Sequence, residues 1–331
     1  MANKFTTDDY VKGVLSGDRR ILAKTITLIE SNLQADKEMA REILEQLLPH
    51  TGSAIRLGIT GVPGVGKSVF IETFGTFLTQ NNRSVAVLAV DPTSARSGGS
   101  VLGDKTRMEK LSADPMAYIR PSPSGTTLGG IAAKTRESML ACEAAGFDVV
   151  IVETVGVGQS ETTVASMVDF FLVLMLAGAG DELQGIKKGI IELADAIAVT
   201  KADGDNVERA EKAKKDYETA LHMLAPQASV WHPPVLVCSA FAMRGIKEIW
   251  ETVLNHRQAL SNAGEFSAKR KKQAIRWMWG IIDAGIKEKF MAMPEVRKRL
   301  PEVTAGVEKG EITATHGANR LLFYLDKRLK I

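Results

Sequence analysis

The sequence predicts an α/β fold in which a mostly parallel β-sheet is covered by helices on both faces. Its apolar residues form continuous runs rather than alternating with polar ones, which is typical of strands buried on both faces. Amphipathic stretches with helical spacing separate these runs, as the crossover connections between parallel strands require. The runs expected to form strands are 54–60, 84–90, 148–154, 170–176, 196–200 and 235–238, with a short extended piece at 117–119. The helices expected between them are 126–145, 182–194, 206–224 and 245–260.

Residues 1–50 precede the first expected strand and predict a helical N-terminal extension. Within them, Gly17-Asp18 indicates a break that is followed by the N-cap of a new helix. The small residues Thr51-Gly52-Ser53 mark the boundary with the central domain, which we expect to span 51–262. The apolar positions with helical spacing are Val11, Leu15, Ile21, Leu22, Ile26, Leu28, Ile29, Ile43, Leu44, Leu47 and Leu48.

The remaining residues, 263–331, contain no strand-like run and predict a helical C-terminal arm. The apolar positions on its first long helix are Ile275, Trp277, Met278, Ile281, Ile282, Ile286 and Phe290. Because so much apolar surface on an appendage needs a partner, we expect a second copy of the chain to cover it in a homodimer. The basic clusters of this part lack interleaved aromatic residues, so we expect solvated helix faces there and no nucleic-acid partner.

The composition is that of an ordinary globular protein and narrows the classes of function. Of 331 residues, 45% are hydrophobic and 24% are charged, and the net charge of +3 gives no indication of nucleic-acid binding. Cys142 and Cys238 lie in apolar segments without metal-ligand spacing, as expected of core residues in a reducing compartment. The N-terminus resembles neither a signal peptide nor an organelle presequence, and no apolar run is long enough to span a bilayer. We therefore expect a cytoplasmic protein with no membrane partner.

The residues after the first expected strand form a phosphate-binding loop. Segment 61–68 reads GVPGVGKS and matches the G-x-x-x-x-G-K-[ST] motif between a strand and a helix, which predicts a P-loop NTPase fold. A dinucleotide fingerprint is disfavoured because it would need glycine at position 69. Lys67 would reach the β- and γ-phosphates as a catalytic cation, and the Ser68 hydroxyl would ligate Mg²⁺. The loop residues expected to bind nucleotide are Gly61, Val62, Pro63, Gly64, Val65, Gly66, Lys67, Ser68 and Val69.

Two later segments indicate that the base of the nucleotide is guanine. Thr200, Lys201 and Asp203 follow a core strand where GTPases carry N-K-x-D. The aspartate accepts two hydrogen bonds that guanine can donate and adenine cannot, while the lysine stem packs on the base. Thr200 stands where that motif has asparagine, so we expect guanine preference with weakened affinity. The segment Ser239, Ala240 and Phe241 matches the short S-A element whose backbone contacts guanine O6.

Carboxylates at the ends of three other segments are candidates for a Mg²⁺ site. Glu153 and Gly156 stand where GTPases carry D-x-x-G, with glutamate replacing aspartate. Asp91 and Asp104 are candidate Mg²⁺ or water-orienting carboxylates, although either residue could instead cap a helix or stabilise a loop. Val157 occupies the place of the glutamine that orients water in Ras-like proteins, so we expect slow intrinsic hydrolysis. Gln159 and nearby basic residues are possible substitutes.

The glycine-punctuated segment 178–189 follows the expected strand at 170–176. Glycines that flank charged residues suit a loop that reorders with nucleotide state. A plain connection between a strand and a helix is the alternative reading.

With these motifs in order, the sequence resembles the MeaB/ArgK family of P-loop GTPases over nearly the whole chain. The segments that carry the resemblance are 61–68, 89–92, 99–108, 119–122, 153–161 and 180–188. The resemblance implies an accessory GTPase of an adenosylcobalamin-dependent acyl-CoA mutase, chiefly methylmalonyl-CoA mutase. Such a protein gates cobalamin loading and protects or reactivates the mutase, and an adenosyltransferase is a further implied partner.

The resemblance also implies roles for individual parts of this chain. It assigns Asp91, Asp104 and Glu153, with Ser68, to the Mg²⁺ site. It also makes 180–188 a switch loop, with Lys187 as a candidate catalytic residue for stimulated hydrolysis. GTP, GDP and Mg²⁺ are the expected ligands. Two other functions stay open: a kinase of the lysine/arginine/ornithine transport-system type, and a GTP-binding interaction module with negligible turnover.

Overall fold

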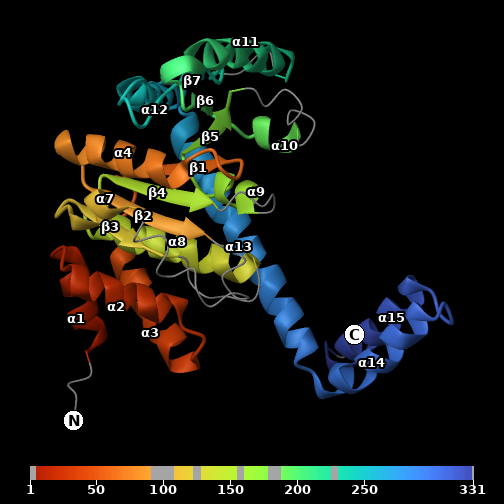
Figure 1. The fold of residues 1–331 in the computed structure, drawn as a ribbon. Helices are drawn as coiled ribbons and strands as arrows, with labels where there is room; N and C mark the ends of the chain where they lie inside the picture. Colours follow the sequence, from red (N-terminus) through yellow and green to blue (C-terminus); the bar gives the residue numbers. More distant parts are fainter. Residues whose placement is uncertain are drawn as a thin grey trace. The chain divides into compact units, whose positions relative to one another are not determined.

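A computed structural model describes residues 5–90, 108–121, 128–154, 160–177, 188–224 and 230–329. Its centre is a seven-stranded sheet in which all neighbouring strands are parallel, in the order β3-β2-β4-β1-β5-β6-β7 (Figure 1). The strands are β1 (Ile55–Gly61), β2 (Val85–Val90), β3 (Ala117–Arg120), β4 (Val149–Thr154), β5 (Phe170–Leu176), β6 (Ala196–Thr200) and β7 (Val235–Val237). The predicted α/β fold with a mostly parallel sheet is confirmed, and the short piece at 117–119 forms its edge strand.

The continuous apolar runs form strands because both faces of the sheet are covered. Every residue of β1, β2, β4 and β6 is buried, so these strands show no alternation of exposed polar and buried apolar residues. One face packs against α4 (Lys67–Gln80), α7 (Glu109–Ala113) and α12 (Ile246–Asn262). The other face packs against α8 (Leu128–Ala144), α9 (Ser160–Ala165), α10 (Lys188–Ile191) and α11 (Val207–Leu224). Figure 1 shows α4 and α8 on opposite sides of the central strands.

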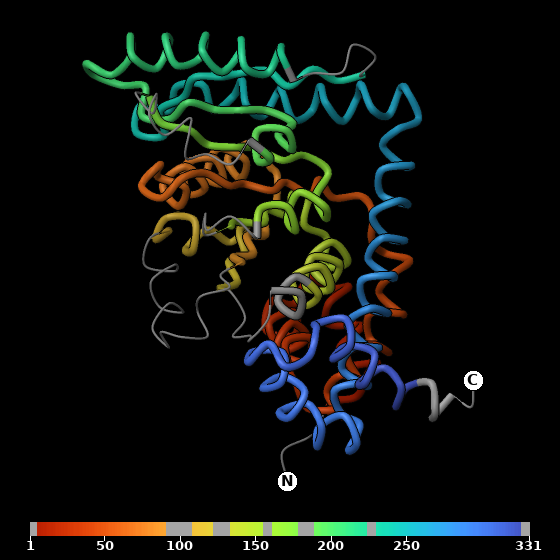
Figure 2. The backbone as a smooth tube through the Cα atoms, turned by 90° about the vertical axis from the view of Figure 1, so that its right-hand side faces the viewer, coloured from red at the N-terminus to blue at the C-terminus, as the bar shows by residue number. Residues whose placement is uncertain are grey.

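Three N-terminal helices lie over α8. They are α1 (Thr7–Leu15), α2 (Arg19–Glu30) and α3 (Gln34–Leu47), and the short 3₁₀ helix η1 (Leu48–His50) follows them. Asp18 caps α2 by accepting hydrogen bonds from the amides of Arg20 and Ile21, which confirms the expected break and N-cap. Both views place the three helices beside α8 (Figures 1 and 2), and Arg120 of β3 pairs with Glu30 at the end of α2.

The helix expected at 182–194 is much shorter among the described residues. Only Lys188–Ile191 is helical there, and residues 178–187 lie outside the described part of the chain. After this short helix, Asp195 precedes β6, and its carboxylate accepts a hydrogen bond from the amide of Phe171 at 2.9 Å. The short 3₁₀ helix η2 (Gly204–Asn206) leads into α11.

The chain forms two compact units, residues 1–270 and 271–331. The helix α13 (Glu265–Met291) begins in the first unit and continues in the second, which also contains α14 (Pro294–Glu308) and α15 (Ala314–Leu329). In the second unit, Gly317 of α15 lets that helix approach Val303 and Val307 of α14 closely. The domain boundaries at 50/51 and 262/263 stay predictions from the sequence.

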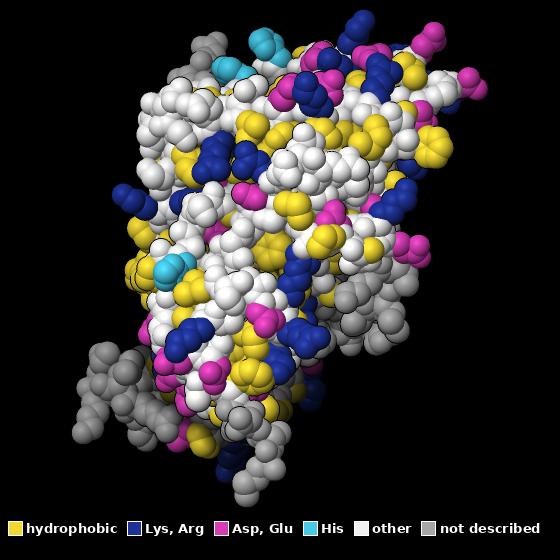
Figure 3. Space-filling model, turned by 90° about the vertical axis from the view of Figure 1, so that its left-hand side faces the viewer, with side chains coloured by type: hydrophobic (Ala, Val, Ile, Leu, Met, Phe, Trp, Pro, Cys, Tyr) yellow, Lys and Arg dark blue, Asp and Glu magenta, His cyan; other side chains and the backbone are white. Residues whose placement is uncertain are grey.

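On the face drawn in Figure 3, acidic and basic side chains are interspersed.

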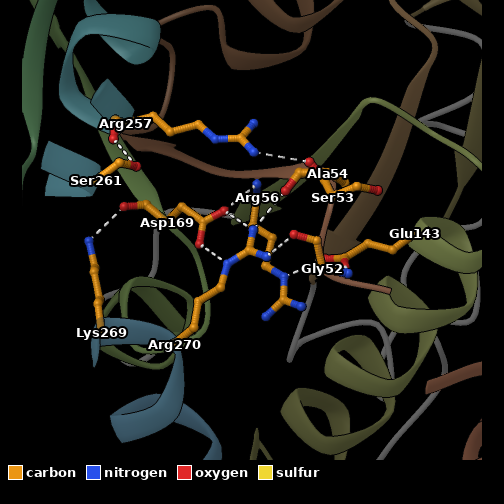
Figure 4. Close-up of polar contacts among 10 residues, drawn as sticks. All are labelled: Gly52, Ser53, Ala54, Arg56, Glu143, Asp169, Arg257, Ser261, Lys269 and Arg270. Carbon is orange, nitrogen blue, oxygen red and sulfur yellow. Dashed lines mark hydrogen bonds and ion pairs between the residues drawn. The ribbon is translucent and has the colours of Figure 1, made fainter. Parts of the chain in front are cut away.

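An ionic network at the amino ends of β1 and β5 binds the second turn of α13 (Figure 4). Arg270 donates to both carboxylate oxygens of Asp169, at 2.8 and 2.6 Å, and to the carbonyl oxygens of Gly52 and Ala54. The amide of Arg56 donates to the same Asp169 carboxylate at 2.8 Å. Burial lowers the pKa of Arg270, but the hydrogen bond and the charge of Asp169 raise it more, so the guanidinium stays charged. This network lies at the edge of the sheet opposite to the phosphate-binding loop.

Candidate nucleotide-binding site

The phosphate-binding loop lies at the carboxyl edge of the sheet, where ligands of open α/β sheets bind. β1 ends at Gly61 and α4 begins at Lys67, so the loop leads from a central strand to a helix N-terminus. Gly64 and Gly66 have φ angles of +79° and +92°, which side-chain-bearing residues rarely adopt. A Cβ on Gly61 would lie 2.5 Å from the carbonyl oxygen of Leu174 in β5. Three of the motif glycines are therefore required by backbone geometry.

The Lys67 side chain folds back onto the first residues of this loop. Its ammonium group donates to the carbonyl oxygens of Gly61 at 2.8 Å and Val62 at 3.4 Å. Burial lowers the pKa of Lys67, while the negative charges of Glu153 and Glu161 oppose that shift. A partly desolvated cation at a helix N-terminus is suited to binding phosphate oxygens.

The first turn of α4 brings Ser68 to the end of β4. The Ser68 hydroxyl donates to a carboxylate oxygen of Glu153 at 3.4 Å, and Glu153 is buried in the strand beside β1. Behind them, the hydroxyls of Thr154 and Thr60 are 2.7 Å apart and join the same two strands. A serine hydroxyl and a carboxylate are the hard oxygen ligands that Mg²⁺ takes beside nucleotide phosphates, so these two residues fit that ion.

Several predicted site residues lie outside the part of the chain that the structure describes. These are Asp91, Asp104 and Lys187, together with Gly156, Val157 and Gln159. In the described ranges, no three His, Cys, Asp or Glu side chains form a metal cluster. The structure therefore brings together Ser68 and Glu153 of the expected Mg²⁺ set, and the roles of the other carboxylates stay predictions.

The Thr200 hydroxyl contacts the phosphate-binding loop, and the effect of this residue on guanine affinity stays a prediction. Its buried hydroxyl lies 3.0 Å from the carbonyl oxygen of Val65 and 3.3 Å from that of Met175. Both partners are acceptors, so the hydroxyl proton serves one of them at a time or is shared. The side chain thus joins β6 to the loop that would hold the phosphates and to the end of β5.

Lys201 and Asp203 form the next part of the site. Lys201 has a φ of +57°, and its Cε is 3.9 Å from the place that a Cβ on Gly66 would take, so its stem lies along the loop. The Asn206 side chain donates to the Lys201 carbonyl oxygen at 2.7 Å and stabilises this turn. Asp203 accepts a hydrogen bond from the Ser239 hydroxyl, which fixes one side of its carboxylate and leaves acceptor capacity on the other.

The residues after β7 contact both Asp203 and α4. The Ala240 carbonyl oxygen accepts a hydrogen bond from Thr73 of α4 at 3.4 Å, one turn beyond the exposed Val69. The sequence predicted only backbone contacts between this segment and the base. The Ser239 side-chain hydrogen bond and the contact of Thr73 were not expected from it. A hydroxyl one helical turn after Val69 was a signal, but it was too weak to assign without the fold.

The sequence matches the model of a known protein family. A family model described as "Methylmalonyl Co-A mutase-associated GTPase MeaB" matches residues 22–295. GTPase ArgK of Escherichia coli (strain K12) is 48% identical over 321 residues, covering 97% of this chain and 97% of that protein. The methylmalonic aciduria type A homolog, mitochondrial, of Mus musculus is 44% identical over 325 residues, covering 95% of this chain and 78% of that protein.

A solved structure has a similar fold over the same length. A crystal structure described as a LAO/AO transport system kinase superposes with a TM-score of 0.79 at 37% identity, covering 98% of this chain and 99% of that one. Of the helices in the described part of this chain, none is both long and apolar enough to cross a bilayer.

Proposed function

This chain belongs to the MeaB family of GTPases, and from that membership we propose that it is a Mg²⁺-dependent accessory GTPase of an adenosylcobalamin-dependent acyl-CoA mutase. The mutase is of the methylmalonyl-CoA type, and the nucleotide state of this chain gates cofactor loading and protects or reactivates the mutase. An adenosyltransferase that supplies the cofactor is a further partner in this proposal.

One observation carries the proposal: the matching family model is described by its association with methylmalonyl-CoA mutase. It spans residues 22–295, which include all residues of the proposed nucleotide site. The mouse relative, whose name refers to methylmalonic aciduria, supports the same assignment. The geometry supports the nucleotide part, because Lys67, Ser68 and Glu153 gather at one end of the site and Asp203 and Ser239 at the other.

Hydrolysis would depend mainly on positioning and charge. A water oxygen bonds to the γ-phosphorus while the bond to the β,γ-bridging oxygen breaks, and GDP and phosphate leave. Loop amides and Lys67 hold the phosphates, and Ser68 with Glu153 would hold Mg²⁺, which neutralises charge on the β- and γ-oxygens when bound. Asp91, Asp104 and Lys187 are the proposed groups for the metal shell and for orienting or stabilising the reacting atoms. Because Val157 replaces a Ras-type glutamine, turnover by the isolated chain would be slow.

A homodimer through the C-terminal arm is part of the proposal. On α13, side chains including Ile275, Trp279 and Ile286 are more than half exposed in the single chain. A contiguous apolar helix face in water favours association with a matching face, and a symmetric dimer is the commonest solution. Sedimentation equilibrium tests it: the wild-type chain should be a dimer, and Ile275→Glu with Ile286→Glu should be a monomer that still binds GDP. A wild-type monomer at micromolar concentration would contradict this part.

The second candidate is a kinase, because the solved structure with 37% identity is described as a transport-system kinase. The Asp203–Ser239 pair disfavours ATP as the donor, since the carboxylate is arranged to accept hydrogen bonds that adenine cannot donate. Radiolabelled γ-phosphate separates the two functions. Label released as free phosphate supports hydrolysis, whereas label on a protein or small-molecule hydroxyl supports the kinase. If the chain binds GTP and neither reaction occurs with any partner, it acts as an interaction module.

The mutase assignment is tested by nucleotide-dependent binding. Purified methylmalonyl-CoA mutase should bind the chain with an affinity that differs between GDP and a non-hydrolysable GTP analogue. Lys67→Ala, which should not bind nucleotide, is the control, and its affinity for the mutase should be the same with either nucleotide. Absence of any complex under all nucleotide conditions would contradict the proposal.

A further inference from the structure

A pair of buried threonine hydroxyls joins β1 and β4 next to the phosphate-binding loop. The backbone pairing of these two strands extends to Ile59 and Glu153, which lie opposite each other. At the next position of each strand, the hydroxyls of Thr60 and Thr154 are 2.7 Å apart, which is hydrogen-bonding distance, and both residues are almost completely buried. Gly61, the first residue of the loop motif, follows directly. Side chains therefore hold the two strands together at the point where the loop begins.

This hydroxyl pair and the expected metal ligand lie on opposite faces of the sheet. Glu153 points toward α4, because its carboxylate accepts a hydrogen bond from Ser68 in the first turn of that helix. Side chains alternate between the two faces along a strand, so Thr154 points toward the face that packs against α8 and α9. Thr60 points the same way, since a Cβ on Gly58, two residues earlier, would lie 3.0 Å from an α9 side chain. The pair thus joins the strand that carries Glu153 to the strand that leads into the loop.

A Mg²⁺ ion accepts little variation in the positions of its ligands. Ser68 and Glu153 come from different elements, and their oxygens are 3.4 Å apart. Their spacing depends on how β4 is held against β1, because β1 continues through the loop into α4. We propose that the Thr60–Thr154 hydroxyl pair is a positioning element of the metal site, which fixes the end of β4 to β1 and thereby the Glu153 carboxylate relative to Ser68. This inference rests on the proposed Mg²⁺ site and adds to it two residues that do not touch the ion.

The test is metal binding by the full-length chain with GDP, using Mn²⁺ as the probe because it takes the same oxygen ligands as Mg²⁺. The electron paramagnetic resonance signal of free Mn²⁺ measures the affinity. Thr60→Val and Thr154→Val, which keep the side-chain shape, should each weaken Mn²⁺ binding about tenfold, a loss typical of removing a group that orients a metal ligand. Thr154→Ser keeps the hydroxyl and should bind Mn²⁺ like the wild type.

The matched control is Thr79→Val, at the other end of α4. Thr79 is also buried, and its hydroxyl donates to the carbonyl oxygen of Thr76 at 3.0 Å. This variant loses a hydrogen bond as the others do, but far from the metal site. It should bind Mn²⁺ within about twofold of the wild type, because distant sites act independently.

A double variant separates positioning from a merely structural role. Each single valine variant leaves one buried hydroxyl without the partner that it has in the wild type, whereas Thr60→Val with Thr154→Val removes both hydroxyls. The double variant should therefore unfold at a temperature closer to that of the wild type than either single variant does. It should nevertheless bind Mn²⁺ as weakly as they do, because the bond between the strands is still missing. If its Mn²⁺ affinity recovers together with its stability, the pair serves stability alone and the inference is overturned.

The outcomes also distinguish this inference from the metal site on which it rests. If the wild type and all the valine variants bind Mn²⁺ equally well, the metal site stands and the positioning role is wrong. If the wild-type chain with GDP binds no more Mn²⁺ than GDP alone does, the metal site itself fails and the inference fails with it. GDP affinity in EDTA should be the same for all variants, because the pair acts through Glu153. A loss of GDP affinity without metal would show that the pair shapes the phosphate-binding loop instead, and would overturn the inference.

Discussion

The Thr200 hydroxyl lies 3.0 Å from the carbonyl oxygen of Val65, so the last residue of β6 is bonded to the phosphate-binding loop. The two residues are 135 positions apart in the chain, and both are buried. Thr200 also lies 3.3 Å from the carbonyl oxygen of Met175, near the end of β5. One hydroxyl on β6 thus contacts both the phosphate-binding loop and β5, and β6 leads to the residues proposed to bind the base.

Thr200→Val should weaken GDP and GTP binding five- to tenfold. Valine keeps the shape but removes the hydrogen bond, whose loss at a buried acceptor costs ~1 kcal/mol or somewhat more. Thr200→Ser, which keeps the hydroxyl, should bind nucleotide like the wild type. Because the loss affects substrate and product alike, KM should rise while kcat changes little. Equal affinity of the valine variant and the wild type, measured by titration calorimetry, would exclude this positioning role.

Asp203→Asn should relax guanine preference in favour of xanthine. The amide can donate to the xanthine O2 atom, where the carboxylate accepts from the guanine amino group, so the GTP to XTP affinity ratio should fall at least tenfold. Competition binding with both nucleotides measures that ratio. Asp205→Asn, an exposed neighbour in η2, is the control and should leave it unchanged. The base-reading assignment fails if Asp203→Asn keeps wild-type GTP affinity.

Arg270→Met should destabilise the unit formed by residues 1–270. The change leaves Asp169, whose side chain is 3% exposed, without the guanidinium that binds both of its oxygens. Removing one partner of a buried ion pair typically costs ~3–5 kcal/mol of unfolding free energy. Urea denaturation followed by far-UV circular dichroism measures it. The adjacent and exposed Lys271→Met should cost less than ~0.5 kcal/mol. Similar effects of both variants would show that the Asp169–Arg270 pair contributes little.

Asp195 should make stability depend on pH in the acid range. Burial would raise the pKa of Asp195, but the hydrogen bond from His256, the charges of Lys269 and His256 and the amide of Phe171 together hold it below the ordinary 3.8. A carboxyl with a lowered pKa in the folded state contributes stability above pH 3.8, which is lost as pH falls through the folded pKa. Asp195→Asn should therefore be less stable than the wild type at pH 6, and the difference should shrink toward pH 3. A difference that stays constant with pH would contradict the assignment.

The sequence predicted the parts of this fold that short stretches encode. A continuous apolar run such as 170–176 indicates a strand buried on both faces, and Gly17-Asp18 indicates a helix start through its own side chain. The GVPGVGKS segment likewise encodes a loop whose glycine φ angles are local requirements. The guanine prediction also used short motifs, since those that contain Lys67, Asp203 and Ser239 follow one another along the chain in the order found in GTPases.

The contacts between distant residues could not be predicted in this way. From the sequence, Thr200 is recognisable only as a replacement for the asparagine of the N-K-x-D motif. Its partner Val65 lies near it because β6 pairs with β5 and β5 pairs with β1. The sequence placed Arg270 among several solvated basic residues. Its partner Asp169 is distant in the sequence, so no local pattern indicates the pair. Such ion pairs depend on the packing of a helix against strand ends, which a periodic pattern does not specify.

The proposed function is tested by measuring phosphate release from GTP and from ATP, each with and without purified methylmalonyl-CoA mutase. We expect slow GTP turnover, little ATP turnover and a several-fold rise in GTP turnover when the mutase is added, because the complex would supply the orientation that the isolated chain lacks. Equal turnover of ATP and GTP, or GTP turnover that the mutase leaves unchanged, would contradict this proposal.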